Sequence, residues 1–127
     1  MKLLTAEWVA KAEGDFAMVE REARARKNPS PDGLCFHAQQ CAEKYLKARL
    51  CEAGRRVEKV HDLAALLDSV VRVEPLWESY RADLAYLSEF AVRYRYPGES
   101  ATMAMAQRAR RLCRSFRLTA RQSLGLP

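Results

Sequence analysis

Four polar side chains with the chemistry to hold a phosphate recur along one stretch of the sequence. His37, Gln40, Lys44 and Lys47 fall within about 80° of one another when the stretch is drawn as a helix with ~100° per residue. Lysine supplies positive charge, the glutamine amide supplies directed hydrogen bonds, and histidine can supply either. The spacing therefore predicts a thin polar strip that binds the phosphate and base edge of a nucleotide, with a solvated helix face as the alternative.

Two further groups extend this candidate site. His61 stands at the expected start of a helix, where free backbone N–H groups favour an anion. Arg93, Arg95 and Tyr96 lie in one short run, and their side chains suit phosphate contact and base stacking. We expect all four residues beside the strip or at its rim. No glycine-rich phosphate loop accompanies them, so the sequence does not indicate a dinucleotide or triphosphate fold.

A row of arginines near the C-terminus offers a second positively charged surface. Arg110, Arg114, Arg117 and Arg121 recur at the helical spacing i, i+4, i+7 and i+11. Residues 93–127 contain eight arginines and one acidic residue, so the whole net charge of +6 originates in the last quarter of the chain. The row predicts contact with a nucleic-acid phosphate or an acidic partner surface, with water and counterions as the alternative.

The cysteines, Cys35, Cys41, Cys51 and Cys113, are interpreted as small apolar core residues. Because Cys35 and Cys41 would point to different sides of a helix, no metal site is predicted. The sequence has no stretch of 18 apolar residues, and the acidic Glu7 comes too early for a signal peptide. We therefore expect a cytoplasmic protein with reduced thiols, no membrane segment and no cofactor.

The composition favours helices. The chain has 20 alanines and 15 leucines but only 11 β-branched residues, none of them isoleucine, which disfavours a sheet. A chain of 127 residues with five glycines and five prolines makes one domain with few turns. The apolar spacing predicts five helices, the third of them short, over about residues 5–26, 32–53, 63–71, 75–95 and 100–123. The expected fold is an all-α, antiparallel up-and-down bundle with four long helices and one shorter helix at its side.

The expected helix over residues 32–53 has an unusual apolar surface. Its apolar side chains spread over about 200° of the circumference, roughly twice the stripe of a helix that packs on a single neighbour. We expect this helix in the centre, in contact with several helices or a second subunit. Gln39 falls inside the apolar arc, so its amide should be buried and hydrogen-bonded.

Four segments of the sequence resemble the HEPN domain of prokaryotes and higher eukaryotes. They are WVAKAEGDF at residues 8–16, FHAQQCAEKYLKA at 36–48, VHDLAALL at 60–67 and AVRYRYP at 91–97. The resemblance spans nearly the whole chain and implies a helical bundle like the substrate-binding domain of some nucleotidyltransferases. It also implies a homodimer, nucleotide binding, and partnership with a separately encoded minimal nucleotidyltransferase in a toxin–antitoxin-like pair.

Many proteins of the family that this chain resembles are metal-independent ribonucleases with an R-x4-6-H motif near the start of a late helix. The corresponding segment, residues 93–100, contains no histidine, which argues against an enzyme. Arg56 and His61 match the spacing elsewhere, and an arginine on a phosphate with a histidine that moves a proton suits RNA cleavage. The leading hypothesis is a binding module, and the alternatives are a ribonuclease with this pair and a purely structural interaction bundle.

Overall fold

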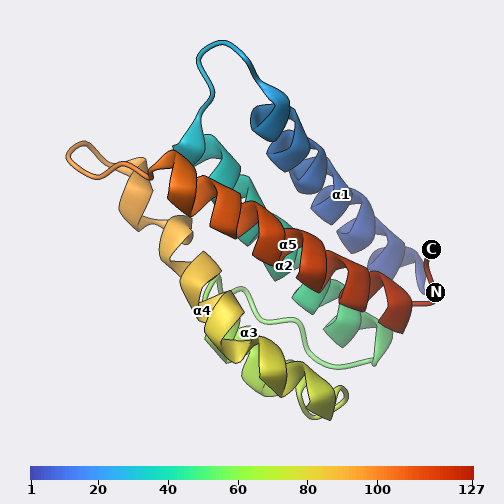
Figure 1. Cartoon of the computed structure of the whole chain (residues 1–127). Helices are drawn as coiled ribbons and strands as arrows, with labels where there is room; N and C mark the ends of the chain where they lie inside the picture. Colours follow the sequence, from blue (N-terminus) through green and yellow to red (C-terminus); the bar gives the residue numbers. More distant parts are fainter.

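The computed structural model describes all 127 residues and contains no strand. Its long helices are α1 (Leu3–Arg24), α2 (Pro31–Glu52) and α5 (Met103–Ser123). Between α2 and α5 the chain forms the helix α3 (Leu63–Val70), the 3-10 helix η1 (Pro75–Tyr80), the helix α4 (Arg81–Ser88), and the short 3-10 turns η2 (Glu89–Ala91) and η3 (Arg93–Arg95). Successive long segments run in opposite directions (Figure 1), so the predicted all-α, up-and-down bundle is confirmed.

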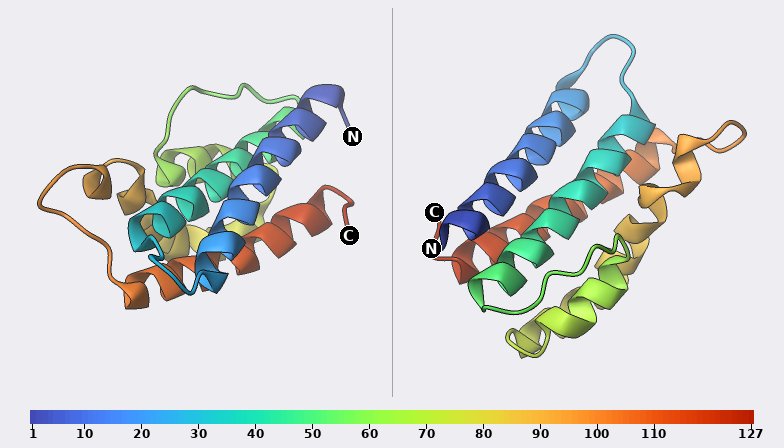
Figure 2. Two further views of the ribbon diagram at one scale, coloured as in Figure 1. Left: turned by 90° about the horizontal axis from the view of Figure 1, so that it is seen from above. Right: turned by 180° about the vertical axis from the view of Figure 1, so that it is seen from behind.

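Helix α2 is the centre of the bundle. It packs against α1 and α5 along its length and against α3 and α4 on a further side (Figure 2). Thirteen of its residues are buried, which confirms the wide apolar arc expected from the sequence. All four cysteines are free and buried in this core. Because burial of a large apolar side chain contributes about 1.5–3 kcal/mol, α2 supplies much of the stability of the fold.

Short polar residues and glycine set the ends of α2 and the start of α3. The Ser30 hydroxyl accepts a hydrogen bond from the Gly33 amide at 2.9 Å and caps α2. Gly54 follows the C-terminus of α2 with φ +69°, a conformation that glycine adopts without strain. The Asp62 side chain then caps α3 by accepting from the Ala64 amide at 3.0 Å. These ends leave residues 55–62 as an irregular connector between α2 and α3.

The predicted helix over residues 75–95 is not continuous, so the expectation of a fourth long helix was wrong. Only residues 81–88 are α-helical, and the flanking turns have 3-10 geometry. In η1, Leu76 is 87% exposed, whereas Trp77 is buried with its ring edge-on to Phe116 of α5. The tighter 3-10 winding changes the direction of successive side chains and turns the larger indole into the core.

Ion pairs join α1 to α5. Arg110 donates two hydrogen bonds to Glu20, at 3.2 and 2.7 Å, and Arg117 donates two to Glu13, at 2.7 and 2.6 Å. Two other members of the arginine row lie farther from the same carboxylates, Arg121 at 3.5 Å from Glu13 and Arg114 at 3.9 Å from Glu20. The acidic residues that face the predicted arginine row therefore belong to α1 of the same chain, and contact of the row with an outside anion stays a prediction.

These pairs change the acidity of both carboxyl groups. Burial raises the pKa of Glu13, but hydrogen bonds from Arg117 and Tyr45 outweigh that effect and hold the pKa below its ordinary value. A hydrogen bond from Arg110 is the main reason why the pKa of Glu20 is lowered. A lowered pKa in the folded state means that each carboxylate stabilises the fold in its ionised form.

Acidification should weaken the contact between α1 and α5. A carboxyl group with a lowered folded-state pKa contributes stability that is present above its unfolded pKa of about 4.3 and is lost as the pH falls through the folded value. We expect the Glu13→Gln/Glu20→Gln variant to be less stable than wild type at pH 7 by about 1 kcal/mol per pair. The difference should shrink below about pH 4.3 in urea unfolding curves recorded across pH.

The matched control for this experiment is Glu7→Gln/Glu89→Gln, which removes two exposed carboxylates that have no basic partner within 4.0 Å. Its stability at pH 7 should equal that of wild type to within about 0.5 kcal/mol. A constant difference between wild type and the Glu13/Glu20 variant at every pH would contradict the assignment.

Candidate functional site

The structure divides the predicted polar strip of α2 into parts with different surroundings. His37 and Lys44 turn toward α1, where both bind the carboxylate of Asp15, which is only 8% exposed. His37 Nδ1 lies 2.7 Å from Asp15 Oδ1, and Lys44 Nζ contacts Oδ2. These two predicted ligand-binding residues are thus occupied by a carboxylate of α1, and they line none of the hollows in the surface.

Lys47 is buried, which corrects the prediction that it faces a groove. Only 5% of the residue is exposed, and its Nζ lies 3.1 Å from Glu43 Oε2. The ammonium group also lies over the ring of Trp8, 5.5 Å from the ring centroid. The apolar arc of α2 is wide and leaves little room for a long polar strip. Helix α1 covers the end of the strip at which Lys47 lies. Lys47 therefore neutralises a buried carboxylate and is closed to a phosphate.

Gln40 belongs to a hollow that also includes His61 and Arg95. The hollow has a volume of about 190 Å³ and is lined by Phe36, Gln40, His61, Ala91, Val92 and Arg95. Helix α2 supplies the first two residues, the connector supplies His61, and the segment from η2 to η3 supplies the others. We call this the His61 hollow. A neighbouring hollow of about 340 Å³ shares two of these residues and is lined by Asp32, Gly33, Phe36, Tyr94 and Arg95.

A buried polar network holds His61 in place. Its Nδ1 lies 2.9 Å from Glu43 Oε1, and Gln39 Nε2 donates to the same carboxylate oxygen at 3.1 Å and to the His61 carbonyl at 3.2 Å. Because an ionised carboxylate only accepts, Nδ1 carries the hydrogen and Nε2 is left free for a ligand. Gln39 is fully buried and Glu43 is 3% exposed. The prediction of a buried, hydrogen-bonded amide at Gln39 is confirmed.

Two acidic residues that organise these contacts were not predicted from the sequence. Glu43 lies on α2 one turn after Gln39 and one turn before Lys47. This i, i+4, i+8 spacing of an amide, an acid and an amine is the sequence pattern that could have indicated the contacts of Glu43. Asp15 lies on α1 among residues that line its buried face. For each of these two carboxylates, the partner that offsets the cost of burial lies on another part of the chain or later in the same helix.

The arginines of η3 have different surroundings. The Arg95 guanidinium lies 5.4 Å from the centroid of the Phe36 ring and has no carboxylate within 4.0 Å. Arg93 Nε lies 3.4 Å from Glu99, and Tyr96 is 63% exposed. Neither Arg93 nor Tyr96 lines the His61 hollow. Tyr96 follows η3 in an extended conformation. Of Arg93, Arg95 and Tyr96, only Arg95 lines the hollow.

Arg56 does not meet His61. It lines a separate hollow with other residues of the connector and of α3. The pair matches the R-x4-6-H spacing in the sequence, but its two side chains belong to different parts of the surface.

The chemistry of the His61 hollow favours an anion that carries a planar group. Arg95 supplies a charged fork of donors, His61 supplies a ring nitrogen, and Gln40 supplies an amide. Phe36 supplies an aromatic face, and none of the lining residues is acidic. Gln40 is itself anchored, since its Nε2 donates to Gln39 Oε1 at 2.6 Å.

A comparison with protein families matches residues 5–122 to the HEPN domain. The chain belongs to the HEPN domain family. This match runs from α1 to the end of α5, so the resemblance noted in the sequence is confirmed. No curated protein and no solved structure matches this HEPN domain. None of its helices combines the length and the apolar character needed to cross a membrane.

The network around Glu43 yields a stability prediction. Glu43→Gln should lower the free energy of unfolding by about 3 kcal/mol, because it leaves Lys47 buried without a counter-charge. The double variant Glu43→Gln/Lys47→Met should recover most of that loss, since an apolar side chain of similar volume needs no partner. Urea unfolding at pH 7 measures both effects. A double variant as unstable as the single one would contradict this account.

Proposed function

We propose that this HEPN domain is a binding module for the phosphate of a nucleotide or nucleic acid, with the ligand in the His61 hollow. The observation that carries the proposal is the hydrogen bond from His61 to the buried Glu43 carboxylate, at 2.9 Å. It orients an exposed imidazole beside an arginine that has no acidic partner. A solvated surface histidine would have no need of a buried carboxylate to fix its ring.

Each lining residue has a separate role in the proposed complex. Arg95 binds the phosphate through its planar fork, and the free Nε2 of His61 makes a second contact to the same group. Gln40 directs its amide to the edge of the base, and Phe36 offers the face on which the base stacks. Charge-assisted hydrogen bonds of this kind contribute about 1.5–3 kcal/mol each, so the arginine should dominate the affinity.

Calorimetric titration with AMP, ATP and GTP tests this site. Arg95→Ala should weaken binding of the preferred nucleotide at least tenfold, as expected for the loss of a charge-assisted contact. The matched control is Arg93→Ala, which removes the same charge two residues away and should change the affinity by less than about threefold. Equal weakening by both variants would reject the site. No binding of any nucleotide would favour a purely structural interaction bundle.

We also propose that the domain forms a homodimer and pairs with a minimal nucleotidyltransferase in a toxin–antitoxin-like arrangement in the cytoplasm. Membership of the HEPN family supports this proposal. A protein partner is further supported by the exposed apolar start of α1, where Leu3 is 88% and Leu4 is 56% exposed. The four buried free thiols suit a reducing compartment.

A metal-independent ribonuclease is the second candidate function. The observation that favours it is again the Glu43–His61 contact, because a carboxylate that orients an imidazole suits proton transfer. With Arg56 in another hollow, Arg95 is the arginine that shares the hollow with this histidine. Arg95 would hold the scissile phosphate and His61 would move the proton.

Incubation of metal-free protein with labelled single-stranded RNA tests the ribonuclease. Cleavage should fall by at least 100-fold in His61→Ala, which removes the general acid–base group, and should persist in His37→Ala. His37 is the matched control because it also binds a carboxylate but lies outside the hollow. Cleavage that survives His61→Ala unchanged would exclude this mechanism.

A further inference from the structure

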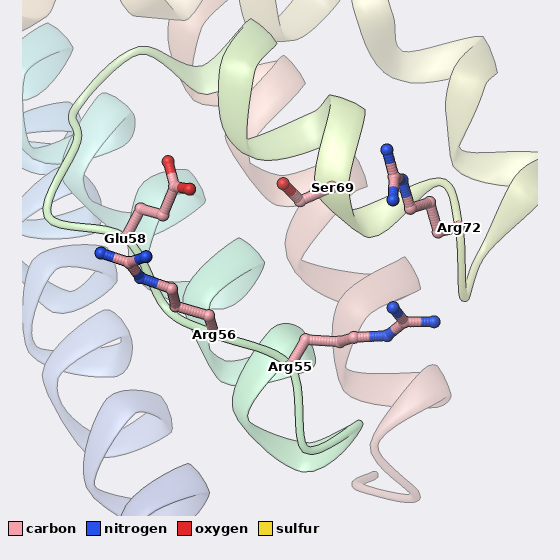
Figure 3. A pocket seen from close by; sticks show the side chains of 5 residues that line it. All are labelled: Arg55, Arg56, Glu58, Ser69 and Arg72. Atoms are coloured by element: carbon pink, nitrogen blue, oxygen red, sulfur yellow. The ribbon is translucent and has the colours of Figure 1, made fainter.

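A second hollow lies between the connector and α3, away from the residues assigned to nucleotide binding. It has a volume of about 270 Å³ and is lined by Arg55, Arg56, Glu58, Ser69 and Arg72 (Figure 3). The first three residues come from the connector, and Ser69 and Arg72 come from the C-terminal end of α3 and the turn that follows it. We call it the connector hollow. None of its lining residues is apolar.

The arginines of the connector hollow lack acidic partners. None of Arg55, Arg56 and Arg72 has a carboxylate oxygen within 4.0 Å, although Glu58 lines the same hollow. Other arginines of this chain do have such partners, among them Arg49 with Glu74 at 2.9 Å. In Figure 3, Arg55 extends from the connector toward the side on which Arg72 lies, whereas Glu58 lies on the opposite side near Arg56. Three guanidinium groups around one hollow repel each other, and a bound anion would remove that repulsion.

The lining selects the kind of anion. A guanidinium fork matches the geometry of phosphate oxygens, and the Ser69 hydroxyl adds a neutral donor on the α3 side. The hollow offers no aromatic or aliphatic side chain on which a base could stack. These features fit a chain of phosphate groups and offer no surface for a base inside the hollow.

We propose that the connector hollow binds a linear phosphate chain. Arg55 and Arg72 hold the chain from the connector and the α3 side, Ser69 donates a hydrogen bond to it, and Arg56 adds positive charge at the edge. The chain is either free inorganic polyphosphate or the phosphate tail of a nucleoside triphosphate. This site is independent of the ligand proposed for the His61 hollow, since the two hollows share no residue.

Calorimetric titration with inorganic tripolyphosphate at low ionic strength tests the site. The Arg55→Ala/Arg72→Ala variant should bind at least tenfold more weakly than wild type. The matched control is Arg24→Ala/Arg26→Ala, which removes two exposed arginines near the end of α1 and should change the affinity by less than threefold. Neither Arg55 nor Arg72 makes a side-chain hydrogen bond or ion pair, so the variant should melt at the wild-type temperature.

Parallel titrations with ATP distinguish the two sources of the phosphate chain. If Arg55→Ala/Arg72→Ala weakens ATP and tripolyphosphate alike, the hollow takes the tail of a nucleotide. If it weakens tripolyphosphate alone, the hollow takes a free chain. Arg95→Ala leaves tripolyphosphate binding unchanged in either case, so the outcome is separate from that of the nucleotide site. The absence of tripolyphosphate binding, or equal weakening by the two double variants, would overturn the proposal.

Discussion

The structure depends on one buried carboxylate. Glu43 lies in the middle of the central helix, where an ionised group is costly unless every oxygen has a partner. Lys47 satisfies one oxygen, and Gln39 and His61 satisfy the other. The last of these partners comes from the connector between α2 and α3, so the same requirement that stabilises the core also fixes an irregular segment against it. The chemistry on the surface is thus a consequence of a constraint in the interior.

A similar principle joins the outer helices. Helix α1 packs closely on α2 but meets α5 mainly through side chains that reach across, Arg110 to Glu20 and Arg117 to Glu13. The Arg117 guanidinium also lies over the ring of Phe16, at 4.2 Å from the centroid. Charge concentrated in the last helix is therefore partly neutralised within the chain. Charge without internal partners remains at Arg95, around the connector, and at Arg111 of α5, which lines a hollow with Arg110 and Arg114.

The sequence was sufficient for the fold and for part of the site. Regular apolar spacing revealed the helices and the burial of Gln39, because both depend on local periodicity. Lys47 was misassigned because its partner, Glu43, makes burial favourable, and helical angle alone does not reveal that pairing. The ion pairs of Arg110 and Arg117 with α1 were not predicted because the partners lie some 90 or more positions away in the chain. The helix expected over residues 75–95 begins instead with a 3-10 helix, which buries Trp77 and leaves Leu76 exposed.

Both ends of the chain lie at the same end of the bundle, away from the turn at residues 96–100, in all three views (Figures 1 and 2). The His61 hollow contains Arg95, which directly precedes that turn. A protein module fused to either terminus would emerge far from this turn, at the same end of the bundle. The geometry therefore permits the domain to be joined to a further module at either terminus with its His61 hollow still accessible.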